Sequence, residues 1–215
     1  MDVEFALKCA NLEQLFRRID NKMKPRNLNI LIVGVGGQGT LLASRILGTI
    51  ALNSGLKCKL SEVHGMSQRG GSVVTHVRWG KEVFSPIVCE GDADYILSFE
   101  TLEAIRWSSF LKENGHIIVN NQKILPMPVI TGKDVYPKDA LQILKDKNLS
   151  VIEVDGLKLA ELAGSSKAVN VVLIGILCAK EKIELNLAKE AIKQCVKEKN
   201  LELNLIALEL GYNAL

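Results

Sequence analysis

The segment 34–39 has a glycine spacing that can bind phosphate groups. Its residues are Gly34-Val35-Gly36-Gly37-Gln38-Gly39, the G-x-G-x-x-G pattern, between a run typical of a strand and a run typical of a helix. Such glycines permit a tight turn, and free amides at the following helix N-terminus favour an anionic phosphate or carboxylate. The acidic residue expected about 20 positions further on could be Glu62. A plain structural turn and an interface loop remain alternatives to nucleotide binding.

A second cluster of chemically capable side chains begins within the end of the segment 56–63 and extends beyond it. It is the run Ser61-Glu62-Val63-His64-Gly65-Met66-Ser67-Gln68-Arg69-Gly70-Gly71. His64 is a candidate acid–base residue, although a lone histidine is more often a structural hydrogen-bonding group. Arg69 has a planar fork that could bind a phosphate or carboxylate bidentately, or form a salt bridge across a subunit contact. Ser67, Gln68 and Gly70 complete the candidate loop.

Glu100 is a third candidate, because it directly follows a short buried run, 95–99. Its alternative role is to cap the next helix. In an open α/β sheet, ligands bind outside the carboxyl ends of the strands, so both loops and Glu100 are expected at one edge. No set of nucleophile, base and orienting residue has a recognisable spacing, which predicts that the chain does not catalyse a reaction alone.

The elements that position these residues alternate along the chain. Predicted strands are 29–33, 56–63, 72–79, 95–99, 116–120 and 151–154, and predicted helices are 40–53, 101–112, 138–147, 157–163, 168–180, 187–199 and 201–210. Prolines in the segment 122–137 predict an extended crossing. This order predicts an α/β fold with a Rossmann-like open, mainly parallel sheet, helices on both faces and a helical C-terminal part. Residues 1–26 are expected to form an N-terminal helix and linker, and 27–215 one domain.

Composition excludes several classes of function. The 215 residues carry a formal charge of +3, which is too small to predict a nucleic-acid surface. The longest apolar stretch, 168–179, is too short for a membrane span, and the mixed charges of the N-terminus do not resemble a secretion signal, so we expect a cytoplasmic protein. The cysteines are Cys9, Cys58, Cys89, Cys178 and Cys195. Their wide spacing predicts no metal site and no iron–sulfur cluster within this chain.

Several motifs together resemble the gamma-type domain of 2-oxoacid:ferredoxin oxidoreductases. They are 34–39, 68–71 with the Val-rich strand that follows, 94–100, 103–106, 115–120 and 170–175. The resemblance covers the chain from Asn29 to the last helices. Within the family, the histidine-bearing loop 62–71 resembles the stand-alone beta subunits of indolepyruvate:ferredoxin oxidoreductases more than the gamma subunits of the pyruvate enzymes.

The resemblance implies a subunit that supports oxidative decarboxylation of aryl 2-oxoacids to acyl-CoA, with ferredoxin as electron acceptor. It implies that a large alpha subunit carries thiamine diphosphate and 4Fe-4S clusters, that coenzyme A is a co-substrate, and that this chain binds no cofactor by itself. The glycine turn and the loop 67–71 would then cover the partner's active site or contact an anionic substrate. Three alternatives stay open: a dinucleotide-binding protein acting alone, a gamma subunit of another 2-oxoacid oxidoreductase, and a purely structural interface protein.

Overall fold

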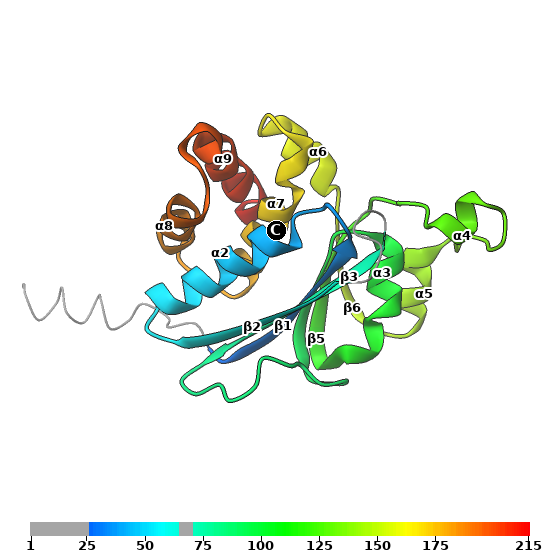
Figure 1. The fold of residues 1–215 in the computed structure, drawn as a ribbon, viewed down its shortest axis with the longest axis horizontal. Coiled ribbons are helices and arrows are strands. Elements are labelled where there is room, and N and C mark those ends of the chain that lie inside the picture. The colour runs from blue at the N-terminus through cyan, green and yellow to red at the C-terminus, as the bar shows by residue number, and fades with distance from the viewer. Residues whose placement is uncertain (1–25, 65–70) are drawn as a thin grey trace, which may run out of the picture.

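The protein folds around one six-stranded sheet (Figure 1). The computed structural model describes residues 26–64 and 71–215; the predicted N-terminal helix lies outside these residues. The strands are β1 (Leu28–Val35), β2 (Lys57–His64), β3 (Ser72–Gly80), β4 (Ala93–Ser98), β5 (Leu111–Asn120) and β6 (Ser150–Val154), in the sheet order β2-β3-β1-β4-β5-β6. The predicted α/β class is confirmed, with β1 inside the sheet as expected.

The direction of β3 makes the sheet mixed. β1, β4, β5 and β6 run parallel, but β3 pairs antiparallel with both β1 and β2. A parallel pair requires a crossover of a dozen or more residues, and the connection between β2 and β3 is too short for one. The expectation of a mainly parallel sheet therefore holds only for the four neighbouring strands β1, β4, β5 and β6.

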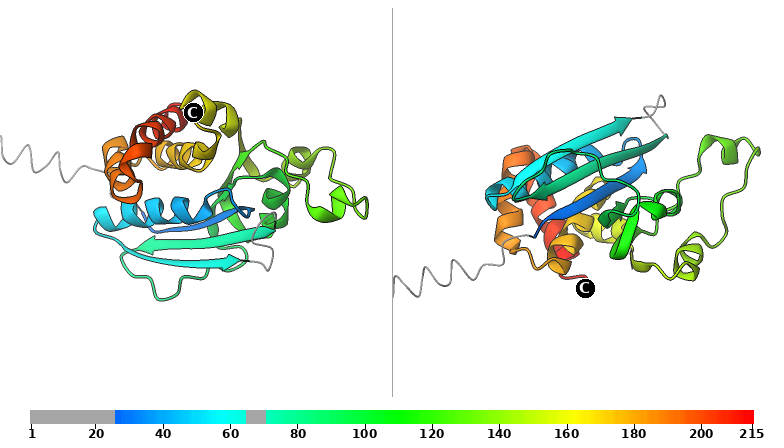
Figure 2. Two further views of the ribbon diagram at one scale, coloured as in Figure 1. Left: turned by 45° about the horizontal axis from the view of Figure 1, so that its top comes forward. Right: turned by 90° about the horizontal axis from the view of Figure 1, so that it is seen from below.

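Helices cover both faces of the sheet (Figure 2). The helices of the described chain are α2 (Thr40–Asn53), α3 (Thr101–Arg106), α4 (Met127–Ile130), α5 (Ala140–Asp146), α6 (Gly156–Leu162), α7 (Val169–Lys180), α8 (Leu185–Cys195) and α9 (Leu201–Tyr212), of which α4 projects away from the sheet. Among the described residues, no helix is long and apolar enough to cross a membrane.

Alternate residues of β1 form the two cores. Ile30 and Ile32 pack in a cluster with α2 and the C-terminal helices, whereas Leu31 and Val33 pack in a cluster with α3 and α5. Successive side chains of a strand point to opposite faces, so a strand covered on both faces must be apolar throughout. This explains the continuous apolar run of β1 in the sequence.

Two predicted segments differ from the structure. The helix predicted at 101–112 ends at Arg106, because Trp107 turns the chain into a short 3₁₀ turn and Leu111 already begins β5. The segment 122–137, predicted to be extended, contains the single-turn helix α4. Proline is compatible with the first turn of a helix, since the amide that it lacks has no partner there.

Candidate functional site

The glycine turn and the second loop meet at the carboxyl end of β1. The amide of Gly36 donates to the carbonyl oxygen of Gly71 at 2.9 Å, and Val35 pairs with Ser72 in the sheet. Because β3 is antiparallel to β1, its first residues lie beside the last residues of β1. The sequence prediction that both loops lie at one edge is therefore confirmed for the residues that the structure describes.

The side chain of Gln38 turns inward and joins two strands. Its Oε1 accepts from the amide of Val35 at 2.7 Å, and its Nε2 donates to the carbonyl of Phe99 at 3.0 Å. Gly34 leaves room for this arrangement, since a Cβ there would lie 2.8 Å from Oε1 of Gln38. Gln38 and Gly34 thus build the turn, and the Gln38 amide is already engaged by the backbone.

Gly37 and Gly39 both adopt backbone angles that favour glycine. Their φ values are +102° and +83°, in the left-handed region. A Cβ on Gly39 would lie 2.6 Å from Nδ2 of Asn170, which donates to the Gly39 carbonyl at 3.1 Å, whereas a Cβ on Gly37 would meet no atom of the described residues within 4 Å. Gly39 therefore allows α7 to approach the turn closely, and no described residue crowds Gly37.

The N-terminus of α2 presents backbone amides at this edge. Among the residues that the structure describes, no side chain caps it, and its first turn contains no acidic residue. The first amides of a helix lack partners within the helix and attract negative charge. The end of α2 has the chemistry to bind an anionic group, as the glycine pattern predicts.

Glu100 is buried and joins the start of α3 to both ends of the segment 122–137. One carboxylate oxygen caps α3 by accepting from the amide of Glu103 at 3.0 Å. The other accepts from the amide of Ile124 at 3.2 Å and from the hydroxyl of Tyr136 at 2.5 Å. Burial, with the bond to Glu100, raises the pKa of Tyr136, so its hydroxyl stays a donor at neutral pH. The alternative role of Glu100 as a helix cap is confirmed, and the side chain also fixes the segment after β5.

Glu103 is a second buried carboxylate that the sequence did not single out. Its Oε2 accepts from the hydroxyl of Ser72 at 2.5 Å, and Oε1 accepts from Nε of Arg106 at 3.2 Å. Ser72 begins β3, directly after the loop 65–71. The sequence offers only one signal for Glu103, its position three residues after the capping Glu100. The contact with Ser72 depends on the antiparallel course of β3.

Most residues of the second loop lie outside the described part of the chain. These are Ser67, Gln68, Arg69 and Gly70, together with the side chain of His64. The backbone of His64 ends β2, where it pairs with Val73. Their predicted contacts with substrate, coenzyme A or a partner remain predictions.

The sheet order argues against dinucleotide binding by this chain alone. In the usual dinucleotide-binding order the second strand lies beside the first, so that its acidic residue can contact the ribose. Here β3 separates β2 from β1, and Glu62 of β2 accepts instead from the hydroxyl of Ser44 in α2 at 3.2 Å. The ligand crevice would lie between β1 and β4, where the Gln38 amide joins Val35 to Phe99.

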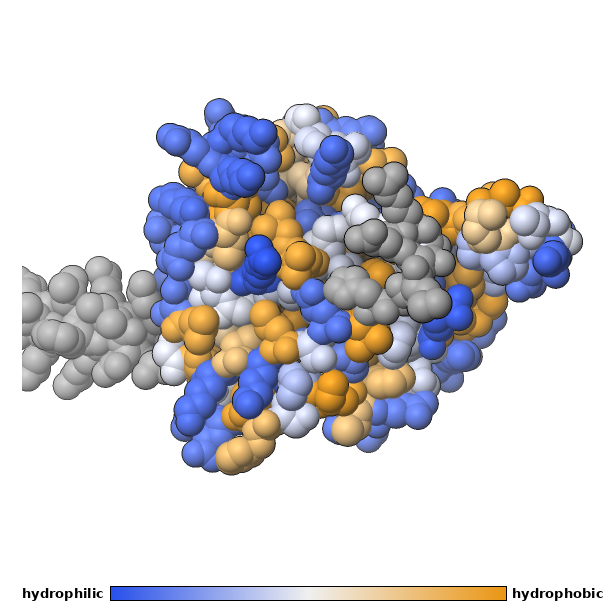
Figure 3. All heavy atoms as spheres, in the orientation of Figure 1, coloured by the Kyte–Doolittle hydropathy of each residue, from blue (hydrophilic) through white to orange (hydrophobic). Residues whose placement is uncertain are grey.

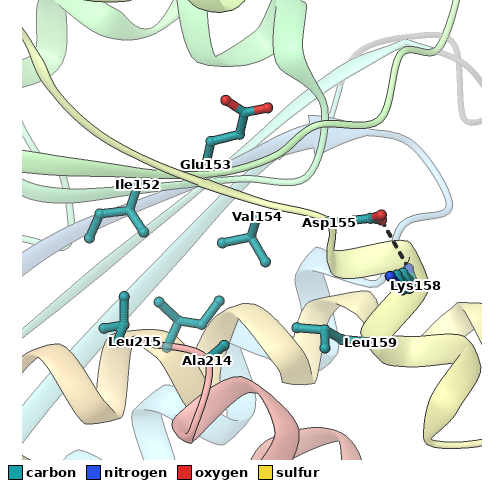
Figure 4. A pocket seen from close by; sticks show the side chains of 9 residues that line it. Ile152, Glu153, Val154, Asp155, Lys158, Leu159, Ala214 and Leu215 are labelled. Carbon is teal, nitrogen blue, oxygen red and sulfur yellow. Dashed lines mark hydrogen bonds between the residues drawn. The ribbon is translucent and has the colours of Figure 1, made fainter.

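Two cavities lie near β6, and neither is lined by the glycine turn. One of about 310 Å³ lies between β6 and the C-terminus; Ile152 and Val154 point toward Ala214 and Leu215, and Glu153 points away (Figure 4). The other, of about 260 Å³, is more polar and lies between α5 and the start of α3. Its lining includes Lys123, Lys138 and Lys145. Within the described ranges, no group of three or more His, Cys, Asp or Glu side chains could hold a metal ion.

Comparison with known proteins identifies the family. Residues 29–214 match the model of the pyruvate ferredoxin/flavodoxin oxidoreductase family. The chain belongs to this family. The indolepyruvate oxidoreductase subunit IorB of Archaeoglobus fulgidus is 42% identical over 190 residues, which cover 86% of this chain and 94% of that protein. The protein of the same name from Thermococcus kodakarensis is 42% identical over 88% of this chain and 96% of its own length.

A solved structure of a 2-oxoglutarate:ferredoxin oxidoreductase from Magnetococcus marinus has the same fold. It superposes with a TM-score of 0.66 at 20% identity, over 87% of this chain and 30% of that much longer chain. This chain thus shares its overall fold with part of a solved 2-oxoglutarate:ferredoxin oxidoreductase.

Proposed function

We propose that this chain is the small subunit of an indolepyruvate:ferredoxin oxidoreductase. The observation that carries the proposal is the 42% identity, over nearly the full length of both chains, to subunits named for that activity. The complex would oxidatively decarboxylate aryl 2-oxoacids to acyl-CoA with ferredoxin as electron acceptor. The large subunit would carry thiamine diphosphate, which stabilises the carbanion, and the 4Fe-4S clusters, which accept electrons.

The role of this chain would be to cover the partner's active site with the edge at the carboxyl ends of its parallel strands. The groups that would contact an anionic substrate or coenzyme A are Gly36, Gly37, the first amides of α2, and Ser67 to Gly70. Other predicted site residues would act indirectly, because they hold the turn and the adjoining segment in place. These are Gly34, Gln38, Gly39 and Glu100. Arg69 is the residue best suited to pair with a phosphate or carboxylate.

The test is co-expression with the large-subunit candidate, followed by copurification and a dye-reduction assay with coenzyme A. We expect reduction only with the complex, and a higher kcat/KM with indolepyruvate than with pyruvate or 2-oxoglutarate. A preference for another 2-oxoacid would make the chain a gamma subunit of a different member of the family. An isolated chain that binds NAD, and does not bind the large subunit, would contradict the proposal.

The variant Arg69→Ala distinguishes a role of the loop in substrate contact from a role in assembly. With Arg69→Ala, we expect intact copurification and a KM for coenzyme A or the oxoacid that rises about tenfold or more, since a charge-assisted contact contributes about 1.5–3 kcal/mol. Lys199→Ala removes an exposed cation near the C-terminal helix α9 and serves as the control. Loss of copurification without a change in saturation would favour a structural interface role for the loop.

A further inference from the structure

The segment 122–137 projects from the body of the protein and exposes large apolar side chains. We call this segment the arm. It leaves the sheet after β5, carries α4 and returns to α5 (Figure 1). Four of its side chains are exposed by half or more: Leu125 (50%), Met127 (64%), Ile130 (61%) and Val135 (79%). In Figure 3, apolar surface gathers on this projection.

The base of the arm is fixed to the rigid core at both ends. Glu100, itself 1% exposed, accepts from the amide of Ile124 near the beginning of the arm and from the hydroxyl of Tyr136 near its end. Thr101 donates from its amide and from its hydroxyl to the carbonyl of Gln122, at 3.1 and 3.0 Å. Two residues at the start of α3 therefore hold both ends of the arm.

The tip of the arm has its own hydrogen bonds. The amides of Lys133 and Asp134 donate to the carbonyl of Pro128 at 2.8 and 3.1 Å, and the hydroxyl of Thr131 donates to the carbonyl of Met127 at 3.0 Å. The side chain of Asp134 accepts from the amide of Val135 at 2.8 Å. These hydrogen bonds close the tip into a compact loop and reduce the number of conformations open to it.

A preorganised segment that holds apolar side chains in water has the properties of a binding element. Its ordering entropy is already lost before binding, so burial of the aliphatic groups contributes to affinity. Exposed apolar clusters on soluble proteins mark interaction sites. We propose that the arm is the docking element for the large subunit and inserts Met127, Ile130 and Val135 into an apolar groove of that partner.

The position of the arm favours the large subunit as the occupant. The arm begins at the carboxyl end of β5, on the same edge as the glycine turn and the start of α2. Under the proposed function, on which this inference rests, that edge faces the partner's active site. The arm extends the edge outward, so the same partner would contact both. Within the arm, the cations Lys123 and Lys133 outnumber the single acidic residue, Asp134, and would suit an acidic rim around the groove.

The experiment measures binding of the full-length chain to the large subunit after single substitutions. Ile130→Glu and Met127→Glu place a charge where the groove would exclude water, and we expect each to weaken binding about 30-fold or more, as for a residue central to an interface. Leu52→Glu is the matched control. The side chain of Leu52 is 61% exposed, as is that of Ile130, but Leu52 lies at the C-terminal end of α2. Thermal unfolding midpoints should remain near that of the wild type for all three.

Each other outcome overturns the inference in a recognisable way. Arm variants that bind like the wild type contradict the docking role and leave the proposed function intact. A wild-type chain that does not bind the large subunit contradicts the proposed function, and the docking role with it. A wild-type chain that self-associates, and loses only that property in the arm variants, assigns the arm to a second copy.

Discussion

At the scale of the residue, type alone did not separate ligand-binding groups from structural ones. Gln38 and Glu100 both lie at the edge where ligands collect in α/β sheets, and both have the polar atoms that a ligand would need. In the structure, those atoms are used by the backbone and by Tyr136. A buried polar group without a partner is costly, so such residues tend to be fully hydrogen-bonded within the fold.

Removal of the Gln38 amide should destabilise the fold. Gln38→Ala leaves the amide of Val35 and the carbonyl of Phe99 without their partner, and we expect the free energy of unfolding to fall by about 1–3 kcal/mol. Urea denaturation measures this change. Gln194→Ala, at an exposed position of α8, is the control and should change it by less than about 0.5 kcal/mol. Equal effects would contradict the structural role of Gln38.

The two left-handed glycines should differ in their tolerance of a methyl group. Gly37→Ala introduces backbone strain of about 1–2 kcal/mol and no close contact with the described residues. Gly39→Ala adds a contact of its Cβ with Nδ2 of Asn170 and should cost clearly more. Both costs can be measured by the same denaturation. A Gly37→Ala variant that is less stable than Gly39→Ala would show that the close approach of Asn170 is not what requires Gly39.

At the scale of the element, the first turn of the short helix α3 joins two segments that are distant in the sequence. Its N-terminal residues hold the arm through Glu100 and Thr101, while Glu103 in its first turn holds the start of β3 through Ser72. The chain then turns at Trp107, which lets the residues after 110 reach β5. The helical spacing of apolar residues in 101–112 did not reveal this turn.

Replacement of the Glu100 carboxylate should loosen the arm more than the rest of the fold. Glu100→Gln keeps one acceptor oxygen but replaces the other with an NH₂ group, which cannot accept from the donors on α3 or on the arm. We expect the free energy of unfolding to fall by about 1–3 kcal/mol. Hydrogen exchange should accelerate within 122–137 while β1 and β4 stay protected. Glu113→Gln, an exposed carboxylate of β5, is the control. Unchanged exchange in the arm would contradict the anchoring role of Glu100.

At the scale of the whole molecule, polar contacts join segments that are distant in the sequence. Arg26 forms two hydrogen bonds with Glu181 at the end of α7, at 3.0 and 2.8 Å, and the hydroxyl of Tyr95 donates to the same carboxylate at 2.6 Å. Although burial opposes ionisation of Glu181, these bonds lower its pKa. On the other side of the sheet, Nδ1 of His76 accepts from the amide of Val88 at 3.2 Å and holds the loop between β3 and β4.

The stability of the whole fold should fall in mild acid. Burial lowers the pKa of His76 below its ordinary value of 6.5, and burial, with the charge of Lys180, also lowers that of His116. The unfolded chain therefore binds protons at a higher pH than the folded one, so the stability contribution is complete above about pH 6.5 and is lost as the pH falls toward the folded pKa values.

Unfolding free energies at about pH 5 and pH 8 measure this dependence. His76→Gln removes one titrating group, keeps an acceptor for the Val88 amide, and should reduce the difference between the two pH values; His116 accounts for part of the remainder. A difference unchanged by His76→Gln would contradict the assignment to His76.

The sequence by itself determined the class of fold, the positions of most strands and helices, and the resemblance to the oxidoreductase family. These follow from local patterns, because periodicity and turn residues act over short stretches of chain. Only the tertiary structure decided the reversal of β3, the inward orientation of Gln38, the triple contact of Glu100 and the exposed apolar tip of the arm. Each depends on which segments become neighbours in the folded chain, and burial and hydrogen-bond partners are properties of those neighbours.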